Sequence, residues 1–186
     1  MSYRTHMGQT IGIICLMLVI AGGTTWTGYM HRQQHTLNAA LFRAAAENNP
    51  HKVRLLLHEG ADPNTKWRDD RSLTLFDFSK QMLGADPLES AGGHTALMLA
   101  TIDGKLAVVK ALVESSADVN VRDAEGQTAL HLAVRSHRPE NAAIVLLLAK
   151  HGANLSAQTW DGVSAWDLAA RNPRTMKALK KAAAKK

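Results

Sequence analysis

Nine histidines and a single cysteine are the side chains in this chain of 186 residues that could bind a transition metal or take part in acid–base or nucleophilic catalysis. His31 and His35 are four residues apart, which places two metal ligands on one face of a helix, but no acid or third ligand is near them in the sequence. We interpret them as tail histidines. Cys15 lies inside an apolar run and has no second cysteine with which to form a disulfide or a zinc cluster.

Motifs of common enzymes are absent from the sequence. It contains no Gly-x-Ser-x-Gly nucleophile elbow, no glycine-rich phosphate-binding loop and no pair of histidines with a glutamate between them. Serine, histidine and aspartate occur, but no pattern places a nucleophile beside a base. We therefore predict that the protein is not an enzyme and has no catalytic residue, metal or cofactor.

Internal repeats indicate which elements position the remaining side chains. Gly93–Ala100 (Gly-His-Thr-Ala-Leu-Met-Leu-Ala) matches Gly126–Ala133 at an offset of 33 residues, and Gly162–Ala169 follows after 36. A second signature, of the type Gly-Ala-Asp-x-Asn, occurs at residues 59–64, 115–120 and 151–156. Between the two signatures lies an apolar segment with the composition of a buried helix.

Both signatures resemble those of the ankyrin repeat. That family's unit opens with Gly-x-Thr-Pro-Leu-His, continues through two antiparallel helices and closes with Gly-Ala-Asp-x-Asn. Alanine replaces the proline at Ala96, Ala129 and Ala165, and the histidine remains only at His131, where the resemblance implies a structural hydrogen bond. The resemblance covers residues 36–186 and implies an all-α solenoid of about four helix pairs that binds another protein.

Elementary physical chemistry agrees with this assignment. Threonine or serine before a helix caps its first amides, glycine after a helix permits a left-handed turn, and Asp or Asn stabilises the turn that follows. A single helix pair cannot bury its apolar face, whereas stacked pairs can, and each buried leucine or valine contributes about 1.5 to 3 kcal/mol. We expect units at about 36–64, 93–125, 126–161 and 162–186.

The two end units depart from the pattern, as capping units of a solenoid do. The first expected helix, residues 37–47, has a solvated outer face. The last has Met176, Leu179, Ala182 and Ala183 on one side and lysines on the other, which predicts an amphipathic closing helix.

An insert interrupts the first finger, the loop that follows the first closing signature. Ala61 and Gly93 are 32 residues apart, whereas the equivalent spacing in the next two units is nine, so 23 residues are inserted within 65–92. Because Trp and Arg dominate binding hot spots, the candidate contact residues here are Trp67, Arg68, Asp70 and Arg71. The alternative for the apolar insert residues Phe76, Phe78 and Leu83 is that they pack the insert onto the first two units.

Two regular fingers supply the other candidate contacts with a partner. These residues are Arg122, Asp123 and Glu125 in the second finger, and Gln158, Trp160 and Asp161 in the third. Trp160 has an alternative role in packing the last unit. Three extra residues near 135–140 are expected to lengthen an exposed loop.

The N-terminal residues have the character of a membrane-targeting segment. Residues 7–30 contain no charged side chain, and 11–23 are strongly apolar. We expect residues 1–31 to be a transmembrane signal anchor or a cleaved signal peptide. Arg32 and Arg43 slightly favour a cytoplasmic domain, whereas a short N-terminal tail with one arginine, Arg4, is typical of export. We favour a membrane-anchored domain in the periplasm or outside the cell; release into the periplasm is the alternative.

The net charge of +6 belongs to the C-terminal end of the chain. From Arg171 onward there are seven basic residues and no acid, which leaves 15 basic and 16 acidic residues in the rest. The solvated face of a capping helix explains this tail. Contact with anionic lipid or with an acidic partner is the alternative, and nucleic acid is disfavoured because the tail has no aromatic residue for base stacking.

Together these observations predict a protein-binding module of a bacterial cell envelope. Two specific functions are compatible with such a module: an accessory module that holds or protects an envelope enzyme, or an immunity protein that neutralises a toxin. A membrane-surface or nucleic-acid binder that uses the basic tail is the alternative from a different class.

Overall fold

The computed structural model describes residues 33–67 and 93–184. Within these two ranges all regular structure is helical, apart from two isolated β-bridges, which confirms the all-α class. None of the helices in the described ranges has the length and apolarity needed to cross a membrane. The expected targeting segment, residues 1–31, lies outside the described residues.

Consecutive helices form antiparallel pairs, and each pair is one repeat unit. The first unit consists of a helix over residues 33–46 and α2 (Pro50–His58). The next three units pair α4 (Ala96–Ile102) with α5 (Leu106–Glu114), α6 (Ala129–Arg135) with α7 (Asn141–Lys150), and α8 (Ala165–Ala169) with α9 (Pro173–Ala183). The four expected units are therefore present in the described part of the chain.

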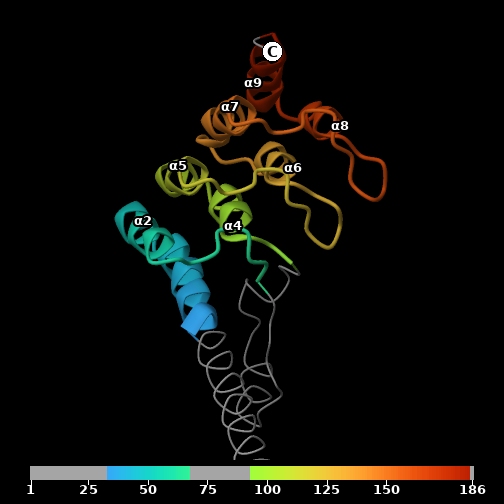
Figure 1. Ribbon diagram of the computed structural model, residues 1–186. Helices are drawn as coiled ribbons and strands as arrows, with labels where there is room; N and C mark the ends of the chain where they lie inside the picture. Colours follow the sequence, from blue (N-terminus) through green and yellow to red (C-terminus); the bar gives the residue numbers. More distant parts are fainter. Residues whose placement is uncertain (1–32, 68–92, 185–186) are drawn as a thin grey trace, which may run out of the picture.

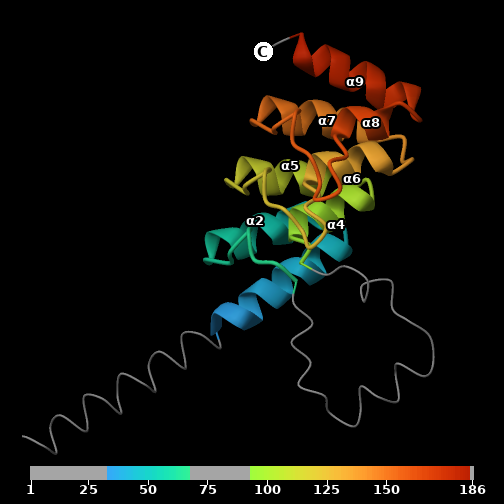
Figure 2. The same cartoon turned by 90° about the vertical axis from the view of Figure 1, so that its right-hand side faces the viewer.

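The helix pairs stack in two layers (Figures 1 and 2). One layer contains the helix over residues 33–46, α4, α6 and α8, and the other contains α2, α5, α7 and α9. Contacts run along each layer, from α4 to α6 to α8 and from α2 to α5 to α7 to α9. They also run within the pairs α4 and α5, α6 and α7, and α8 and α9. The loops that join successive units project beside α6 and α8, at the right of Figure 1.

A single apolar core runs along the stack between the two layers. It has a similar composition in every unit because each helix contributes buried leucine, isoleucine, valine or alanine side chains. Fully buried members include Leu41, Val53, Leu97, Val108, Leu112, Leu130, Ile144, Leu148 and Leu179. Leu55 is different: it belongs to an apolar run of the sequence but lies 51% exposed on α2.

An asparagine ladder joins neighbouring units beneath the fingers. The side-chain oxygen of Asn64 accepts a hydrogen bond from the amide of Asp118 at 2.8 Å, and that of Asn120 accepts one from Asn154 at 2.8 Å. Within each closing signature, the Asp or Asn that follows the alanine also accepts from the amide two residues later. Asp62 accepts from Asn64 at 2.9 Å, Asp118 from Asn120 at 2.8 Å and Asn154 from Ser156 at 3.0 Å. The turn-stabilising role that we predicted for these side chains is confirmed, whereas the bonds between units were not anticipated.

The lengthened loop of the third unit covers residues 136–140, between α6 and α7. His137, Arg138 and Pro139 are exposed, as expected. Asn141 is fully buried and its side-chain amide donates to the carbonyl oxygens of Ala133 at 2.9 Å and Ser136 at 3.0 Å. This side chain supplies donors to carbonyl groups that the helix itself leaves unpaired at the end of α6.

The two end helices match the capping pattern with small differences. The first helix spans residues 33–46, so it begins at least four residues before the expected Leu37, and His35 is helical and not part of a tail. On α9 the buried side chains are Thr175, Ala178, Leu179 and Ala182, whereas Ala183 is exposed. The exposed side of α9 carries Lys177, Lys180 and Lys181, so the prediction of an amphipathic closing helix is confirmed.

Candidate protein-binding surface at the finger tips

Each finger is closed at its base by the same backbone hydrogen bond. The amide of Trp67 donates to the carbonyl of His94 at 2.7 Å. The equivalent bonds join Asp123 to Gln127 at 2.9 Å and Thr159 to Val163 at 2.9 Å. These bonds align the three fingers residue by residue, so the tip of each finger is the segment between the bonded positions.

The alignment places the insert at the tip of the first finger. Two residues lie between Asp123 and Gly126 and between Thr159 and Gly162, but 25 lie between Trp67 and Gly93, which agrees with 23 inserted residues. Thr65, Lys66 and Trp67, which we had assigned to the insert, belong instead to the finger base, because Lys66 bridges to Thr95. The fold of the repeats thus continues up to both ends of the insert.

Trp67 is only partly exposed, because its ring packs against the core. Its ring centroid lies 5.0 Å from that of Phe42 in an edge-on arrangement with an interplanar angle of 72°. Phe42 itself is 5% exposed and belongs to the core of the first unit. The other insert candidates, Arg68, Asp70 and Arg71, lie outside the described residues, as do Phe76, Phe78 and Leu83.

Trp160 is the most exposed large apolar side chain in the described residues, at 66%, and it is nevertheless fixed in place. Its indole Nε1–H donates to the carbonyl of Ala124 at 3.0 Å and its backbone amide donates to the carbonyl of Glu125 at 3.2 Å. Both acceptors lie at the tip of the second finger. The third finger is therefore attached to the second through one aromatic residue.

Arg122 completes this arrangement. Its guanidinium carbon lies 5.1 Å from the centroid of the Trp160 ring, within cation–π range, and its Nη1 donates to the carbonyl of Gln158 at 2.8 Å. Gly126 allows the close approach of the ring, because a Cβ atom there would lie 2.7 Å from Cδ2 of Trp160. We call Arg122, Gly126 and Trp160 the finger-tip cluster; Arg122 directly precedes the tip of the second finger, and Gly126 and Trp160 lie in the tips of the second and third fingers.

The six residues predicted in the regular fingers thus have different surroundings. Arg122 and Trp160 contact each other, and the side chains of Glu125, Gln158 and Asp161 are exposed around them. Asp123 is an exception, because its residue is only 4% exposed. Its Oδ1 accepts from the amides of Glu125 at 3.0 Å and Gln127 at 2.7 Å, so this buried carboxylate stabilises the backbone conformation of the second finger.

Histidine 131 has the structural role that the resemblance implied. Its Nε2–H donates to the carbonyl of Ala157 at 3.0 Å, and its Nδ1 accepts from the amide of Thr128 at 3.2 Å. The side chain is fully buried, and this burial lowers the pKa of the imidazole below 6.5, although the bond to Ala157 opposes the effect. The ring therefore joins the start of α6 to the base of the third finger in its neutral form.

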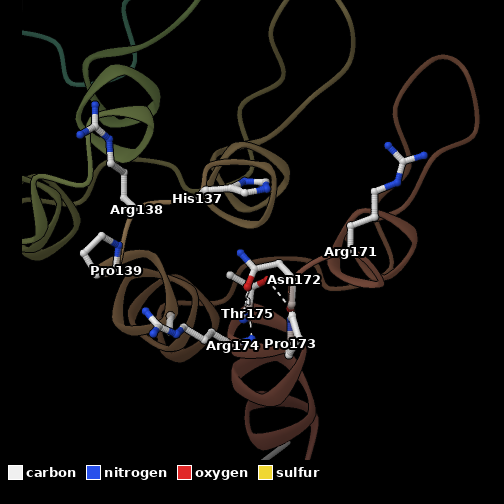
Figure 3. A pocket seen from close by; sticks show the side chains of 9 residues that line it. His137, Arg138, Pro139, Arg171, Asn172, Pro173, Arg174 and Thr175 are labelled. Carbon is white, nitrogen blue, oxygen red and sulfur yellow. Dashed lines mark hydrogen bonds between the residues drawn. The ribbon is translucent and has the colours of Figure 1, made fainter.

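A shallow pocket of about 280 Å³ lies between the α6–α7 loop and the start of α9. Four of its nine lining residues are basic: His137, Arg138, Arg171 and Arg174. Figure 3 shows that the three arginine side chains extend in different directions and do not converge on one point. The amides of Arg174 and Thr175 at the start of α9 are already bonded to the side chain of Asn172. This arrangement does not create a single phosphate-binding site.

The stacked helix pairs, the finger bases and the asparagine ladder define a helical repeat solenoid that presents a row of finger tips. Comparison with known families identifies which one. The model of a single ankyrin repeat matches residues 37–68, and the model of three ankyrin repeats matches residues 73–159. The chain belongs to the ankyrin-repeat family, as the sequence motifs predicted.

Relatives of known name share this repeat region. Human Rabankyrin-5 is 32% identical over 115 residues, which is 62% of this chain and 9% of that protein. Mouse neurogenic locus notch homolog protein 1 is 32% identical over 108 residues, 58% of this chain and 4% of that protein. A putative ankyrin repeat protein of Rickettsia bellii is 31% identical over 127 residues, which is 66% of this chain and 51% of that protein. The similarity therefore concerns the repeats and covers about half of a relative's length at most among these three.

Proposed function

We propose that this protein is a protein–protein interaction module that holds a partner polypeptide against its finger tips and first-layer helices. Ankyrin repeats generally mediate such interactions and are typical non-enzymatic binding modules. The observation that carries the proposal for this chain is Trp160, whose ring is 66% exposed and yet fixed by two hydrogen bonds and by Arg122.

A fixed, exposed tryptophan favours binding for energetic reasons. A side chain that is ordered before the partner arrives loses little conformational entropy on binding, so more of the contact energy appears as affinity. Tryptophan and arginine are also the residues that most often dominate interface energetics. The neighbouring polar side chains of Glu125, Gln158 and Asp161 supply the rim that surrounds such an anchor.

The partner can be identified and the surface tested with the full chain. Cross-linking in cells followed by mass spectrometry identifies the bound protein, and the affinity is then measured on purified components. We expect Trp160→Ala to weaken binding by about 30-fold, which corresponds to about 2 kcal/mol. Leu55→Ala is the matched control, because Leu55 is 51% exposed and lies on α2, a helix of the second layer.

Two outcomes would contradict the proposed surface. One is equal affinity for the wild type and Trp160→Ala, which removes the finger-tip cluster from the interface. The other is a loss of affinity in Leu55→Ala alone, which places the interface on the second helix layer. The free energy of unfolding of both variants is measured in parallel, so that loss of folding is distinguished from loss of contact.

We further propose that the module acts at a bacterial membrane, with residues 7–30 as its anchor or signal. This proposal is supported by the absence of charge from those residues. Fractionation of cells that express the full chain is the test, with a chain that starts at residue 32 as the control. Recovery of both chains in the soluble cytoplasmic fraction would exclude the proposal, and a nanomolar complex with a toxin would favour the immunity version.

A further inference from the structure

Three potential metal ligands gather where the first finger meets the second. They are the imidazole of His94, the carboxylate of Asp123 and the carboxylate of Glu125, and their ligand atoms all lie within 4.8 Å of one another. They come from the base of the first finger and from the second finger. The resemblance to ankyrin repeats assigned them no such role.

Local structure fixes two of the three side chains before any ligand arrives. Oδ1 of Asp123 accepts two backbone amides of its own finger, which leaves Oδ2 directed at His94, where it lies 3.2 Å from Nε2. His94 is 8% exposed and the side chain of Asp123 is 0% exposed. The side chain of Glu125 is exposed, so it can move towards the other two.

The distance between His94 and Asp123 also suits two ligands of one ion. Zinc binds histidine nitrogen and carboxylate oxygen at about 2.0 to 2.2 Å in a tetrahedral arrangement, which places neighbouring ligand atoms about 3.4 Å apart. The observed separation of 3.2 Å between Nε2 and Oδ2 is close to this value. Little movement of the two buried side chains would therefore be needed.

The protein itself leaves this imidazole only partly satisfied. Nδ1 of His94 is buried and has no hydrogen-bond partner in the described residues. By contrast, both ring nitrogens of His131, one unit along, are bonded. His94 thus differs from His131 in having one unpaired nitrogen, Nδ1, whereas the proposed ligand atom is Nε2, which faces Asp123.

The next pair of fingers provides an internal comparison. The positions equivalent to His94, Asp123 and Glu125 are occupied by Gln127, Thr159 and Asp161. That set contains no imidazole and only one carboxylate, so it lacks the donors that a transition-metal ion prefers. The three-ligand cluster is therefore a property of one finger junction and not of the repeat in general.

We propose that His94, Asp123 and Glu125 form a binding site for a divalent transition-metal ion of the zinc class. Three protein ligands leave the fourth position of a tetrahedral ion open to water or to another ligand. A bound ion joins the first finger to the second. It also orders Glu125, whose carbonyl accepts the amide of Trp160, so it stiffens the finger-tip cluster.

Zinc and cobalt binding to the purified full chain provide the test. Equilibrium dialysis and calorimetry measure Zn²⁺ affinity, and the visible absorption of Co²⁺ reports tetrahedral coordination. We expect His94→Gln and Glu125→Gln to weaken the affinity of this site at least about tenfold. His94→Gln is expected to fold, because the equivalent position already holds glutamine, Gln127.

Asp161→Asn is the matched control, because Asp161 occupies the position equivalent to Glu125 in the third finger. We expect it to bind Zn²⁺ like the wild type and to show the same rise in Tm when Zn²⁺ is added. The chain contains nine histidines, so the comparison concerns the difference in Zn²⁺ affinity between variants and not the total amount of Zn²⁺ bound.

Equal affinity, Co²⁺ spectrum and Tm shift in wild type, His94→Gln and Glu125→Gln would overturn the proposal. The His94–Asp123 contact would then be a hydrogen bond only. Because the readout is metal binding, this result is independent of whether Trp160 contacts a partner.

Discussion

At the residue scale, three different side chains close the same hydrogen bond at the starts of α4, α6 and α8. Met98, His131 and Asp167 each occupy the third helical position and accept from the amide of the capping threonine or serine. The distances are 3.4 Å to sulfur, 3.2 Å to Nδ1 and 2.9 Å to Oδ2. The family's histidine is present only at His131, but the hydrogen bond to the amide of the capping residue is made in all three helices.

The three versions of this contact respond differently to pH. Hydrogen bonds from the hydroxyl and amide of Ser164 lower the pKa of Asp167. A lowered carboxyl pKa gives stability that is present above the ordinary value and lost as the pH falls through the lowered one. Met98 does not titrate. Burial disfavours the charged form of His131 and lowers its pKa, so the stability that depends on His131 is also lost as the pH falls, but in a range that begins near 6.5 and not in the acidic range of Asp167.

The first prediction concerns this pH dependence. Because the pKa of His131 is lowered from 6.5 in the folded state, the unfolded chain takes up this proton first as the pH falls below 6.5. The free energy of unfolding should therefore decrease below that pH, by at most about 1.4 kcal/mol per pH unit for this one group, until the lowered pKa is reached. Urea unfolding at pH 7.5, 6.5 and 5.5 measures the slope.

His131→Met is the comparison, because methionine already fills the equivalent position at Met98. We expect this variant to be less stable at pH 7.5 by about 1 to 3 kcal/mol, since it loses the bond to Ala157 and leaves that carbonyl unpaired. Its stability should depend less on pH than that of the wild type. The other histidines are common to both chains, so identical slopes would show that His131 does not titrate differently on unfolding.

The second prediction uses two glycines with nearly the same backbone conformation. Gly126 and Gly162 have φ of +77° and +76°, so alanine at either position adopts a left-handed conformation at a cost of about 1 kcal/mol. Only at Gly126 would the new Cβ meet the Trp160 ring, at 2.7 Å, whereas nothing lies within 4 Å at Gly162. We expect Gly126→Ala to be less stable than Gly162→Ala by a further 1 to 3 kcal/mol or so.

The position of the Trp160 ring can be followed directly in the same two variants. The indole N–H resonance of Trp160 should shift in Gly126→Ala, because the bond to Ala124 is disturbed, and should stay unchanged in Gly162→Ala. A Trp160→Phe chain assigns that resonance among the four tryptophans. Equal behaviour of the two glycine variants would show that the ring does not rest on Gly126 in solution.

At the element scale, the turns that end the second-layer helices share one conformation but not one residue. Gly60 and Gly152 have φ of +100° and +87°, and Ser116 takes the equivalent position with φ of +66°. A left-handed serine costs about 1 to 2 kcal/mol, whereas glycine loses about 0.5 to 1 kcal/mol more conformational entropy on folding. The serine turn after α5 is therefore the least favourable of the three.

The third prediction follows from this difference. Ser116→Gly should raise the free energy of unfolding by about 0.5 kcal/mol, and the reciprocal change Gly152→Ser should lower it by a similar amount. Chemical denaturation of both variants measures the effect. A destabilising Ser116→Gly would mean that the serine side chain has a contact that outweighs its backbone strain.

Most of the helices could be predicted from their own sequences. The Thr95, Thr128 and Ser164 caps, the apolar periodicity and the closing signatures are local signals, and each marks a helix end that the structure confirms. The asparagine ladder could not be predicted in this way, because Asn64 and Asp118 are 54 residues apart and meet only when two units stack. The burial of Asp123 was missed for the same reason, since its partner His94 is 29 residues away in the sequence, at the base of the preceding finger.

At the scale of the whole molecule, the repeats form a continuous stack across the first finger although 25 residues separate Trp67 from Gly93. The two ends of the insert meet at a backbone hydrogen bond of 2.7 Å between Trp67 and His94. A solenoid tolerates such an insertion because each unit contacts only its neighbours, and the hydrogen bond at the finger base keeps the two units in register on either side of the insert. Closing a long loop also costs little more than closing a short one.

The fourth prediction is that the insert can be removed without loss of the fold. Deleting residues 69–91 leaves two residues between Trp67 and Gly93, as in the next two fingers. The shorter loop should leave the free energy of unfolding unchanged or raise it by up to about 2 kcal/mol. Thermal denaturation and far-UV circular dichroism are the measurements.

A clearly less stable deletion variant would support the alternative that Phe76, Phe78 and Leu83 pack onto the first two units. If the variant is stable, its affinity for the partner shows whether the insert takes part in binding. Trp67 is kept in this variant, so its contact with Phe42 is not affected.

The sequence alone determined the number of units, the class of fold, the size of the insert and the closing signature at which each finger starts. It could do so because capping, turn conformation and apolar periodicity act between residues close together in the chain. Only the tertiary structure decided that Trp160 is exposed but fixed on Gly126, that Asp123 faces inward, and that His94 lies beside Asp123 and Glu125. These properties depend on the distance between neighbouring units, which results from the packing of the whole apolar core and from no single repeat.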